Sequence, residues 1–262
     1  MAKICTLFSG SRGNSTYISS GKEAILIDAG MSCRQILCAL QNNMVSKEDI
    51  KAIFITHAHT DHINALRVLL KNINVPVYAS KETLGQLILE NVIGKDSVCF
   101  DIESKPDLPI NMQVNFFRTS HDCEGSGGYV VTLNDQQKIA LCTDLGVVTD
   151  EIRAKLKGCR AVILESNHDV GMLQNGSYPF ATKQRILSSE GHLSNVSCAE
   201  ELPILVENGT THFVLAHLSR ENNTPDLARV TAESVLTTKG IKSGIDCSLY
   251  VAPPSGGKMI YI

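Results

Sequence analysis

Short apolar runs and longer amphipathic runs follow one another along the chain, separated by polar or glycine-rich turns. Apolar runs bounded by turn residues predict buried strands, and apolar positions repeating every three or four residues predict helices. The predicted strands are 3–8, 15–19, 24–28, 52–55, one beginning at Val75, 113–118, 139–143, 160–164, 212–216 and 247–251. The predicted helices are 33–43, 62–73, 179–189, 195–208 and 225–239. The stretch 97–142 is predicted to be mainly strands with glycine turns.

Predicted strands gathered centrally with helices on both sides favour an α/β fold, namely a four-layer αββα sandwich. The chain has 262 residues, 43% of them hydrophobic, which is enough to bury such a core. No repeat, low-complexity tract or long linker interrupts the pattern. We therefore expect a single domain over residues 1–262.

Charge and cysteine content narrow the class of protein. A net charge of −3 excludes a globally basic surface, so nucleic-acid binding would need a local patch. The nine cysteines are odd in number and lack CxxC spacing, which favours reduced, mostly buried thiols over a disulfide framework. A catalytic thiol is the alternative. With no signal-peptide pattern and no apolar run of transmembrane length, we expect a cytoplasmic protein without membrane contact.

Four side chains of metal-ligand type directly follow the strand 52–55: His57, His59, Asp61 and His62. A strand end, a turn and a helix start bring such side chains to one crevice. Imidazole and carboxylate suit zinc, manganese or iron, and the same groups packed without metal would leave polar atoms unpaired. The alternative is a polar loop with incidental histidines, but three of the eight histidines fall here. The spacing therefore predicts a metal site.

One such turn cannot complete a site, so ligands from other loops are required. His121, Asp144 and His217 each follow an apolar strand, as the first cluster does. Open two-metal sites draw ligands from several loops, which makes these three the candidates. A helix-capping aspartate or a surface histidine is the alternative for each. Asp28 ends a buried strand and could orient a ligand histidine.

The order HxHxDH, strand-end His121, Thr-Asp144-Leu-Gly and Leu-Ala-His217-Leu-Ser resembles the metallo-β-lactamase superfamily over essentially the whole chain. The resemblance implies two divalent ions and hydrolase activity. It implies one ion held by His57, His59 and His121, and a second held by Asp61, His62 and His217. Asp144 resembles the bridging carboxylate of the hydrolase and nuclease branches. The best-known zinc β-lactamases have cysteine there, so antibiotic hydrolysis is not expected.

Further segments are similar to the YycJ (WalJ) group of bacterial proteins within that superfamily. They are Ser9 to Ser15, Ile27 to Gly30, Ser120 to Asp122, Glu165 to Asp169, Gly191 to Asn195 and His217 to Asn223. The resemblance implies a metal-dependent phosphodiesterase or nuclease, with a proposed 5′-to-3′ exonuclease role on DNA.

The last third also resembles ribonuclease Z, where a Gly-His segment opens a helix ahead of the last ligand histidine. By that resemblance His192 is a catalytic proton carrier and Glu165 is its carboxylate partner. The alternatives are a histidine at a helix entry and a carboxylate paired with a surface lysine. The transfer-RNA-docking arm of ribonuclease Z and the inserted domain of ribonuclease J are missing, so large structured RNA is not an expected substrate.

Three more residues are candidates for touching the substrate or supporting a metal ligand from behind: His168, Arg12 and Asn14. His168 lies in the Glu-Ser-Asn-His-Asp segment. Arg12 and Asn14 lie in the Ser9 to Ser15 turn, which offers backbone N–H groups and a guanidinium for a phosphate. A plain hairpin turn is the alternative for this segment.

Two function classes fit the predicted site. The first is a phosphodiesterase or nuclease acting on DNA, in which Asp61 accepts a proton from the attacking water and His192 protonates the leaving oxygen. The second is a small-molecule hydrolase acting on a thioester, a lactone or a cyclic phosphodiester. A non-catalytic metal sensor is a weaker third class. The pattern predicts neither the native metal among zinc, manganese and iron nor the oligomeric state.

Overall fold

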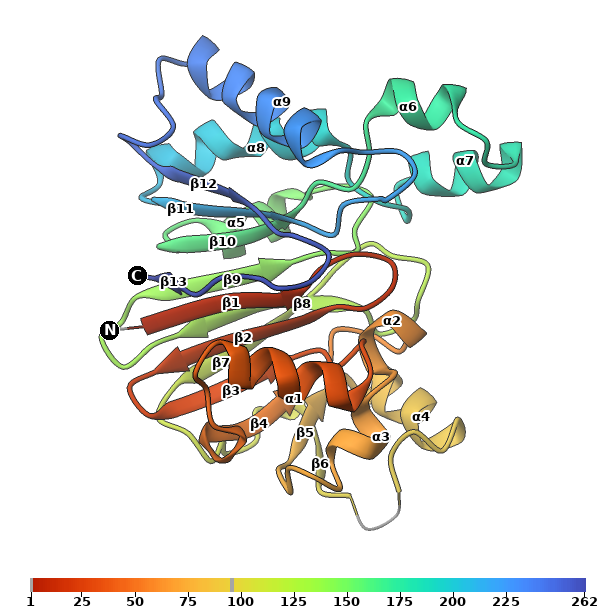
Figure 1. The fold of residues 1–262 in the computed structure, drawn as a ribbon, viewed down its shortest axis with the longest axis vertical. Helices are drawn as coiled ribbons and strands as arrows, with labels where there is room; N and C mark the ends of the chain where they lie inside the picture. Colours follow the sequence, from red (N-terminus) through yellow and green to blue (C-terminus); the bar gives the residue numbers. More distant parts are fainter. Residues whose placement is uncertain (1, 95–96) are drawn as a thin grey trace.

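A computed structural model of the chain describes residues 2–94 and 97–262. Two mixed β-sheets pack face to face, and helices cover both outer faces (Figure 1). Within the described residues the first sheet runs in the order β13 (Ile260–Tyr261), β1 (Ala2–Phe8), β2 (Ser15–Ser20), β3 (Glu23–Ile27), β4 (Ile50–Phe54), β5 (Val77–Ala79) and β6 (Cys99–Asp101). The second runs in the order β12 (Ser248–Val251), β11 (His212–Ala216), β10 (Ala161–Glu165), β9 (Lys138–Cys142), β8 (Gly127–Thr132) and β7 (Gln113–Arg118). The predicted α/β sandwich is confirmed.

Most of the described helices lie on one of the two outer faces. The described helices are α1 (Cys33–Asn42), α2 (Thr60–Ile63), α3 (Leu66–Leu69), α4 (Lys81–Leu89), α5 (Asp150–Leu156), α6 (Val170–Asn175), α7 (Phe180–Leu187), α8 (Asn195–Glu207) and α9 (Pro225–Thr238), with short 3₁₀ turns at Lys47–Asp49 and Ile102–Ser104. Buried residues of α1, α3 and α4 pack on the first sheet. Those of α5, α8 and α9 pack on the second. No helix in the described ranges has the length and apolar character needed to cross a bilayer.

Alternate side chains of each strand enter different cores. In β10, Leu164 packs under the helices, whereas Ile163 packs between the two sheets. Each such burial contributes about 1.5–3 kcal/mol. The same alternation turns the last residue of the strand, Glu165, towards the space between the sheets.

The candidate site residues gather at one edge because their strands point the same way. Strands β9, β10 and β11 are parallel, and β7 and β9 are both antiparallel to β8. In the first sheet, β3 and β4 are parallel. The residues at or just beyond the carboxyl ends of these strands are Asp28, His57, His121, Asp144, Glu165 and His217.

The structure departs from the predicted elements in a few places. The helix expected over 62–73 is two short helices, α2 and α3, because the Ala65 amide donates to the Ala29 carbonyl (2.8 Å) instead of extending the helix. Helices α4, α5 and α6 and strand β13 are additions to the prediction. For α5 the sequence carries a usable signal, since the Thr149 side chain caps its first turn and two acidic residues follow.

Candidate metal-binding active site

The turn after β4 is held by a buried carboxylate from the neighbouring strand. Asp28 accepts hydrogen bonds from the Thr56 amide (2.8 Å) and the Thr56 hydroxyl (2.9 Å). Asp28 has a positive φ of 65°, as do Asp144 (59°) and His217 (57°). Non-glycine residues adopt this left-handed conformation at a cost and are enriched at functional sites. All three lie just beyond a strand and belong to the predicted site.

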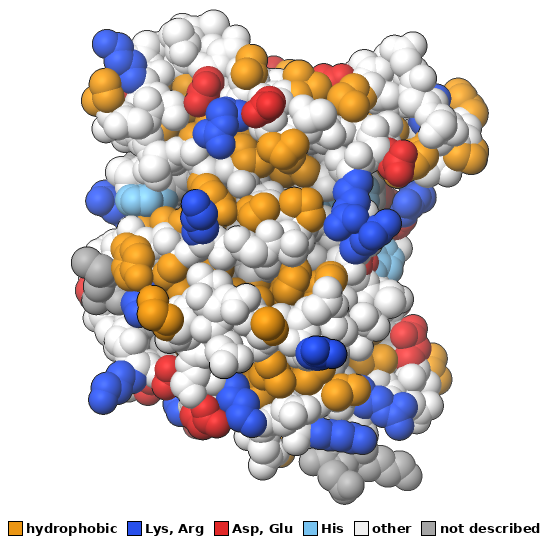
Figure 2. Space-filling model, in the orientation of Figure 1, with side chains coloured by type: hydrophobic (Ala, Val, Ile, Leu, Met, Phe, Trp, Pro, Cys, Tyr) orange, Lys and Arg blue, Asp and Glu red, His pale blue; other side chains and the backbone are white. Residues whose placement is uncertain are grey.

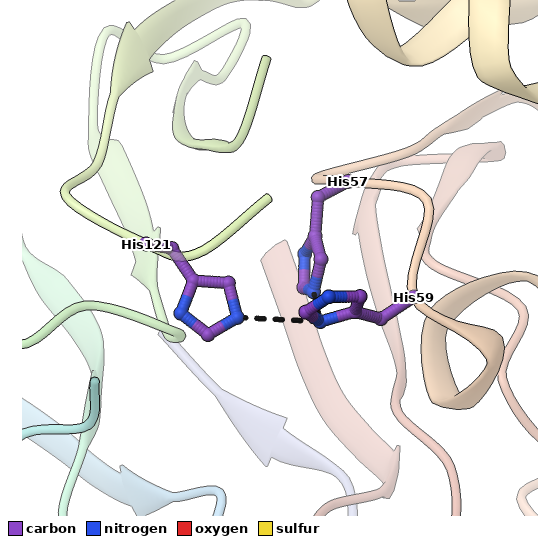
Figure 3. Close-up of side chains that lie close together, drawn as sticks. All are labelled: His57, His59 and His121. Atoms are coloured by element: carbon purple, nitrogen blue, oxygen red, sulfur yellow. Dashed lines mark hydrogen bonds between the residues drawn. The ribbon is translucent and has the colours of Figure 1, made fainter. Parts of the chain in front are cut away.

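Three histidines form the first group of candidate ligands. His57 and His59 come from the turn after β4 and His121 from the loop after β7, and their rings converge (Figure 3). His59 Nδ1 lies 3.1 Å from His57 Nε2 and 3.3 Å from His121 Nε2. Two of the other ring nitrogens face neutral oxygens: His57 Nδ1 lies 3.0 Å from Thr56 Oγ1, and His121 Nδ1 lies 3.3 Å from the Gly191 carbonyl. The third, His59 Nε2, lies 4.0 Å from Asp122 Oδ1. His57 Nε2, His59 Nδ1 and His121 Nε2 are thus the nitrogens that point at one spot.

Asp61, His62 and His217 form the second group. One ligand atom of each lies within 4.8 Å of the others. His62 Nδ1 lies 2.8 Å from Asp28 Oδ2, and His217 Nδ1 lies 2.7 Å from Glu165 Oε1. A carboxylate behind a ligand histidine fixes its tautomer and leaves Nε2 for a metal. Both rings therefore present Nε2 towards Asp61.

Asp144 lies between the two groups. It forms a candidate ligand cluster with His57 and His62, and another with Glu165, His192 and His217. Asp144 Oδ2 lies 3.4 Å from His62 Nε2. Among the described residues, Asp144 Oδ2 and His217 Nε2 are buried and lack a hydrogen-bond partner. Buried polar atoms rarely stay unpaired, and these donor types suit divalent metal ions, so the residues fit the cofactor that the motif predicts.

His192 and Glu165 form the pair that the sequence predicts. His192 Nδ1 lies 2.9 Å from Glu165 Oε1, the same oxygen that contacts His217. Glu165 is fully buried, and its second oxygen accepts the amides of Leu145 and Leu193, each at 3.1 Å. Burial alone would lower the pKa of His192, but the Glu165 carboxylate outweighs it and raises that pKa. A single carboxylate therefore orients both a candidate metal ligand and a candidate proton donor.

Two of the other candidates belong to none of the ligand groups. Arg12 is exposed in the loop between β1 and β2. His168 is buried, and in the described part of the chain both its ring nitrogens lack a partner. Burial lowers the pKa of His168 to about 4, so its ring is neutral at physiological pH. Whether either residue touches substrate stays a prediction.

Asn14 lies inside the site. Its Nδ2 is 3.2 Å from Asp61 Oδ2 and 3.0 Å from His62 Nε2, and its side-chain oxygen accepts the Gly10 amide (2.8 Å). Thr56 is a residue that the sequence analysis missed, since its hydroxyl contacts Asp28, His57 and His62. Its position directly before the HxHxDH segment was the available signal.

An αββα sandwich with a histidine and aspartate cluster at one edge defines a hydrolase of the metallo-β-lactamase fold, a class that uses divalent metal ions. The chain belongs to the beta-lactamase superfamily domain family, whose model matches residues 23–218. It is 36% identical to the exodeoxyribonuclease YycJ of Bacillus anthracis, over 91% of this chain and 90% of that protein. It is 35% identical to the exodeoxyribonuclease WalJ of Streptococcus pneumoniae, over 96% of this chain and 94% of that protein.

A solved structure with the same fold is the metallo-β-lactamase fold protein YhfI of Bacillus subtilis. The TM-score is 0.72 with 18% sequence identity, over 99% of this chain and 98% of that one. The predicted superfamily and the predicted relationship to the YycJ (WalJ) group are confirmed.

Proposed function

We propose that this chain is a DNA exonuclease that cleaves phosphodiester bonds with two divalent metal ions. The observation that carries the proposal is the position of Asp144 between two ligand groups, with the His192–Glu165 pair beside it. The two curated relatives named exodeoxyribonuclease, each aligned over at least nine-tenths of its length, support DNA as the substrate. The 5′-to-3′ direction implied by the resemblance is part of the proposal.

The ligand groups would divide the cofactor between them. His57, His59 and His121 would hold one ion, Asp61, His62 and His217 the other, and Asp144 would contact both. Two such ions would supply a water of lowered pKa and stabilise the negative charge that develops on the phosphoryl oxygens. Asp61 is the least buried carboxylate of the cluster, with 24% of its side chain exposed, and it is the group to which we assign the proton of the attacking water.

His192 would donate the proton that the leaving oxygen needs. Its Nδ1 is engaged by Glu165, so Nε2 is the nitrogen free for donation, and 14% of the side chain remains exposed to a substrate. The Glu165 carboxylate favours the protonated ring, which is the form a general acid requires. Glu165 is thus a positioning residue, and His192 is the catalytic one.

The test compares substrates and metals on one preparation. Protein purified without added metal is analysed for zinc, manganese and iron. It is then assayed with single-stranded DNA carrying a 5′-phosphate, with bis-p-nitrophenyl phosphate and with a thioester. DNA labelled at the 5′ end should release labelled mononucleotide first, whereas 3′-labelled DNA should shorten progressively. Turnover of the thioester alone would contradict the proposal and favour the small-molecule hydrolase.

Matched variants tie the activity to the site. Asp61→Ala and His192→Ala should abolish DNA digestion. His212→Ala should not, because His212 starts β11 at the end opposite the site and its ring contacts the Thr211 hydroxyl (2.8 Å). Equal digestion by all three variants would point to a contaminating nuclease.

A further inference from the structure

Helices α6 and α7 form an arm, residues 170–187, that projects from the body of the fold on the side of the candidate site (Figure 1). The chain enters the arm shortly after Glu165, the last residue of β10, and leaves it shortly before His192, which precedes α8. Lys183 of α7 donates to the Gln174 carbonyl of α6 at 2.9 Å, which ties the two helices together.

The base of the arm is packed tightly on the loops of the candidate site. A Cβ on Gly191 would lie 2.2 Å from the Arg185 carbonyl oxygen, and one on Gly146 would lie 2.3 Å from the Ser188 carbonyl oxygen. A side chain at either glycine would therefore keep the base of the arm from packing this closely on the loops. The Ser120 hydroxyl, next to His121, donates to the Ser189 carbonyl at 2.7 Å. Helix α7 is thus fixed in position relative to the ligand loops.

Arg185 brings a positive charge from the arm to the rim of the three-histidine group. Its Nη1 contacts Asp122 Oδ2, and Asp122 Oδ1 lies 3.3 Å from His121 Nε2. The Arg185 side chain is still 53% exposed. A guanidinium so placed can contact a phosphate next to the one being cleaved.

The outward face of α7 carries two exposed apolar side chains beside a polar one. Phe180 is 77% exposed and Leu187 is 39% exposed, with exposed Gln184 between them at helical spacing. Ile186 supplies the buried contact of the helix instead. Figure 2 shows hydrophobic side chains over the outer end of the arm and Lys and Arg side chains beside histidine on the edge below it. The arm therefore carries an exposed aromatic side chain close to a cationic rim.

We propose that the arm binds the single-stranded segment of the DNA substrate that leads away from the metal ligands. Arg185 contacts a backbone phosphate near the ligand groups, and an unpaired base stacks on Phe180. Phe180 and Arg185 are five positions apart, which is about 7.5 Å along a helix and about 140° around it, so the strand passes around the surface of α7 and a few nucleotides reach both side chains. This inference rests on the proposed function, because it assumes a nucleic-acid substrate.

Charge and shape favour single-stranded DNA over the other occupants of such a face. Stacking on an exposed aromatic needs an unpaired base, which a duplex does not offer. A second copy of this chain would cover the apolar face but would not account for the half-exposed Arg185 at the rim of the three-histidine group. Self-association is therefore the outcome that the test must separate.

The first measurement is the ratio of kcat/KM for single-stranded DNA to kcat/KM for bis-p-nitrophenyl phosphate, which is too small to reach the arm. Phe180→Ala should lower this ratio about ten-fold. Arg185→Gln should lower it too, with partial recovery in Arg185→Lys because the charge returns. The control variants are Tyr261→Ala, a 53% exposed aromatic on β13, and Arg160→Gln, an exposed arginine before β10 at the end opposite the site. Both should keep the wild-type ratio, and an unchanged ratio in Phe180→Ala overturns the inference.

The second measurement separates this inference from the proposed function. Fluorescence anisotropy of a labelled oligothymidine in EDTA reports binding without cleavage. If the wild-type chain bound the oligonucleotide but cleaved no DNA, the proposed function would fail, and a weaker affinity of Phe180→Ala would still support the arm as a DNA surface. If the affinity were equal, or if sedimentation showed that Phe180→Ala only dissociates a dimer, the arm would not be a DNA surface.

Discussion

The two ligand groups are supported in different ways. In the Asp61, His62 and His217 group, a buried carboxylate stands behind each histidine. In the His57, His59 and His121 group, a hydroxyl stands behind His57 and a backbone carbonyl behind His121, and the carboxylate nearest His59 Nε2 is the part-exposed Asp122 at 4.0 Å. A carboxylate partner makes an imidazole a stronger ligand than a neutral oxygen does. The carboxylate-supported group should therefore bind its ion more tightly.

Each group has one part-exposed member, and the first group's is the more open: His59 is 41% exposed and Asp61 is 24% exposed. The His59 side chain borders Asp122 at the rim, whereas the His62 side chain is fully buried. An open group exchanges its ion with solvent more readily than a closed one. Under the proposed two-metal function, one edge of a single sandwich would hold a tightly bound ion beside an exchangeable one. Substitutions that act on one group, on both or on neither can test this.

The largest effect is expected from Asp144→Ala, because Asp144 contacts both groups. Loss of the shared carboxylate should weaken both ions and lower kcat/KM on DNA by about 10³-fold or more, as several kcal/mol of charge stabilisation are lost. Metal analysis by mass spectrometry after gel filtration should find both ions depleted. Full retention of one ion would assign Asp144 to a single group.

The next largest effect is expected at the His192–Glu165 pair, which lies beside both groups. His192→Gln should lower kcat on DNA by about a hundred-fold or more, because the leaving alkoxide loses its proton donor. The loss on bis-p-nitrophenyl phosphate should be much smaller, since nitrophenolate leaves without a proton. The metal content should match that of the His212→Gln control. Depletion of metal in His192→Gln would instead make His192 part of the second group's support.

A more selective effect is expected from Asp28→Asn. The amide keeps the size of the buried side chain but removes the charge behind His62, so the affinity of the second group should fall about 10- to 100-fold. Titration with a chromogenic chelator should show one ion released early and the other unaffected. Asp107→Asn, an exposed loop carboxylate, is the matched control. Equal weakening of both ions would remove the distinction between the groups.

The sequence predicts well which side chains gather at the candidate site, because each is encoded locally. His57, Asp144 and His217 follow apolar strands, and a strand exit is visible in the hydrophobic pattern without knowledge of the partner strands. The sheet order then brings these exits to one edge, which accounts for residues such as His57 and His217 meeting although 160 positions separate them.

The supporting contacts are harder to predict because they depend on register between distant segments. The bond from Asn14 to Asp61 and the sharing of Glu165 by His192 and His217 need the exact pairing of strands and loops. The break between α2 and α3 likewise follows from one tertiary hydrogen bond, from Ala65 to Ala29, which no local pattern predicts. Helical periodicity over 62–73 therefore predicted which side chains are buried, but it did not predict that the helix is interrupted.

The smallest effect is expected from Asn14→Ala, which tests whether the second group needs its neutral support as well. Asn14 donates to Asp61 Oδ2, and its own oxygen accepts the Gly10 amide, so it fixes both the aspartate and the loop between β1 and β2. Losing one such hydrogen bond costs about 1 kcal/mol, which corresponds to about a five-fold fall in kcat on DNA. Asn14→Asp should be worse than Asn14→Ala, because a carboxylate beside Asp61 repels it. Asn208→Ala, an exposed asparagine after α8, is the matched control, and a wild-type kcat in Asn14→Ala would leave the carboxylates as the only support that matters.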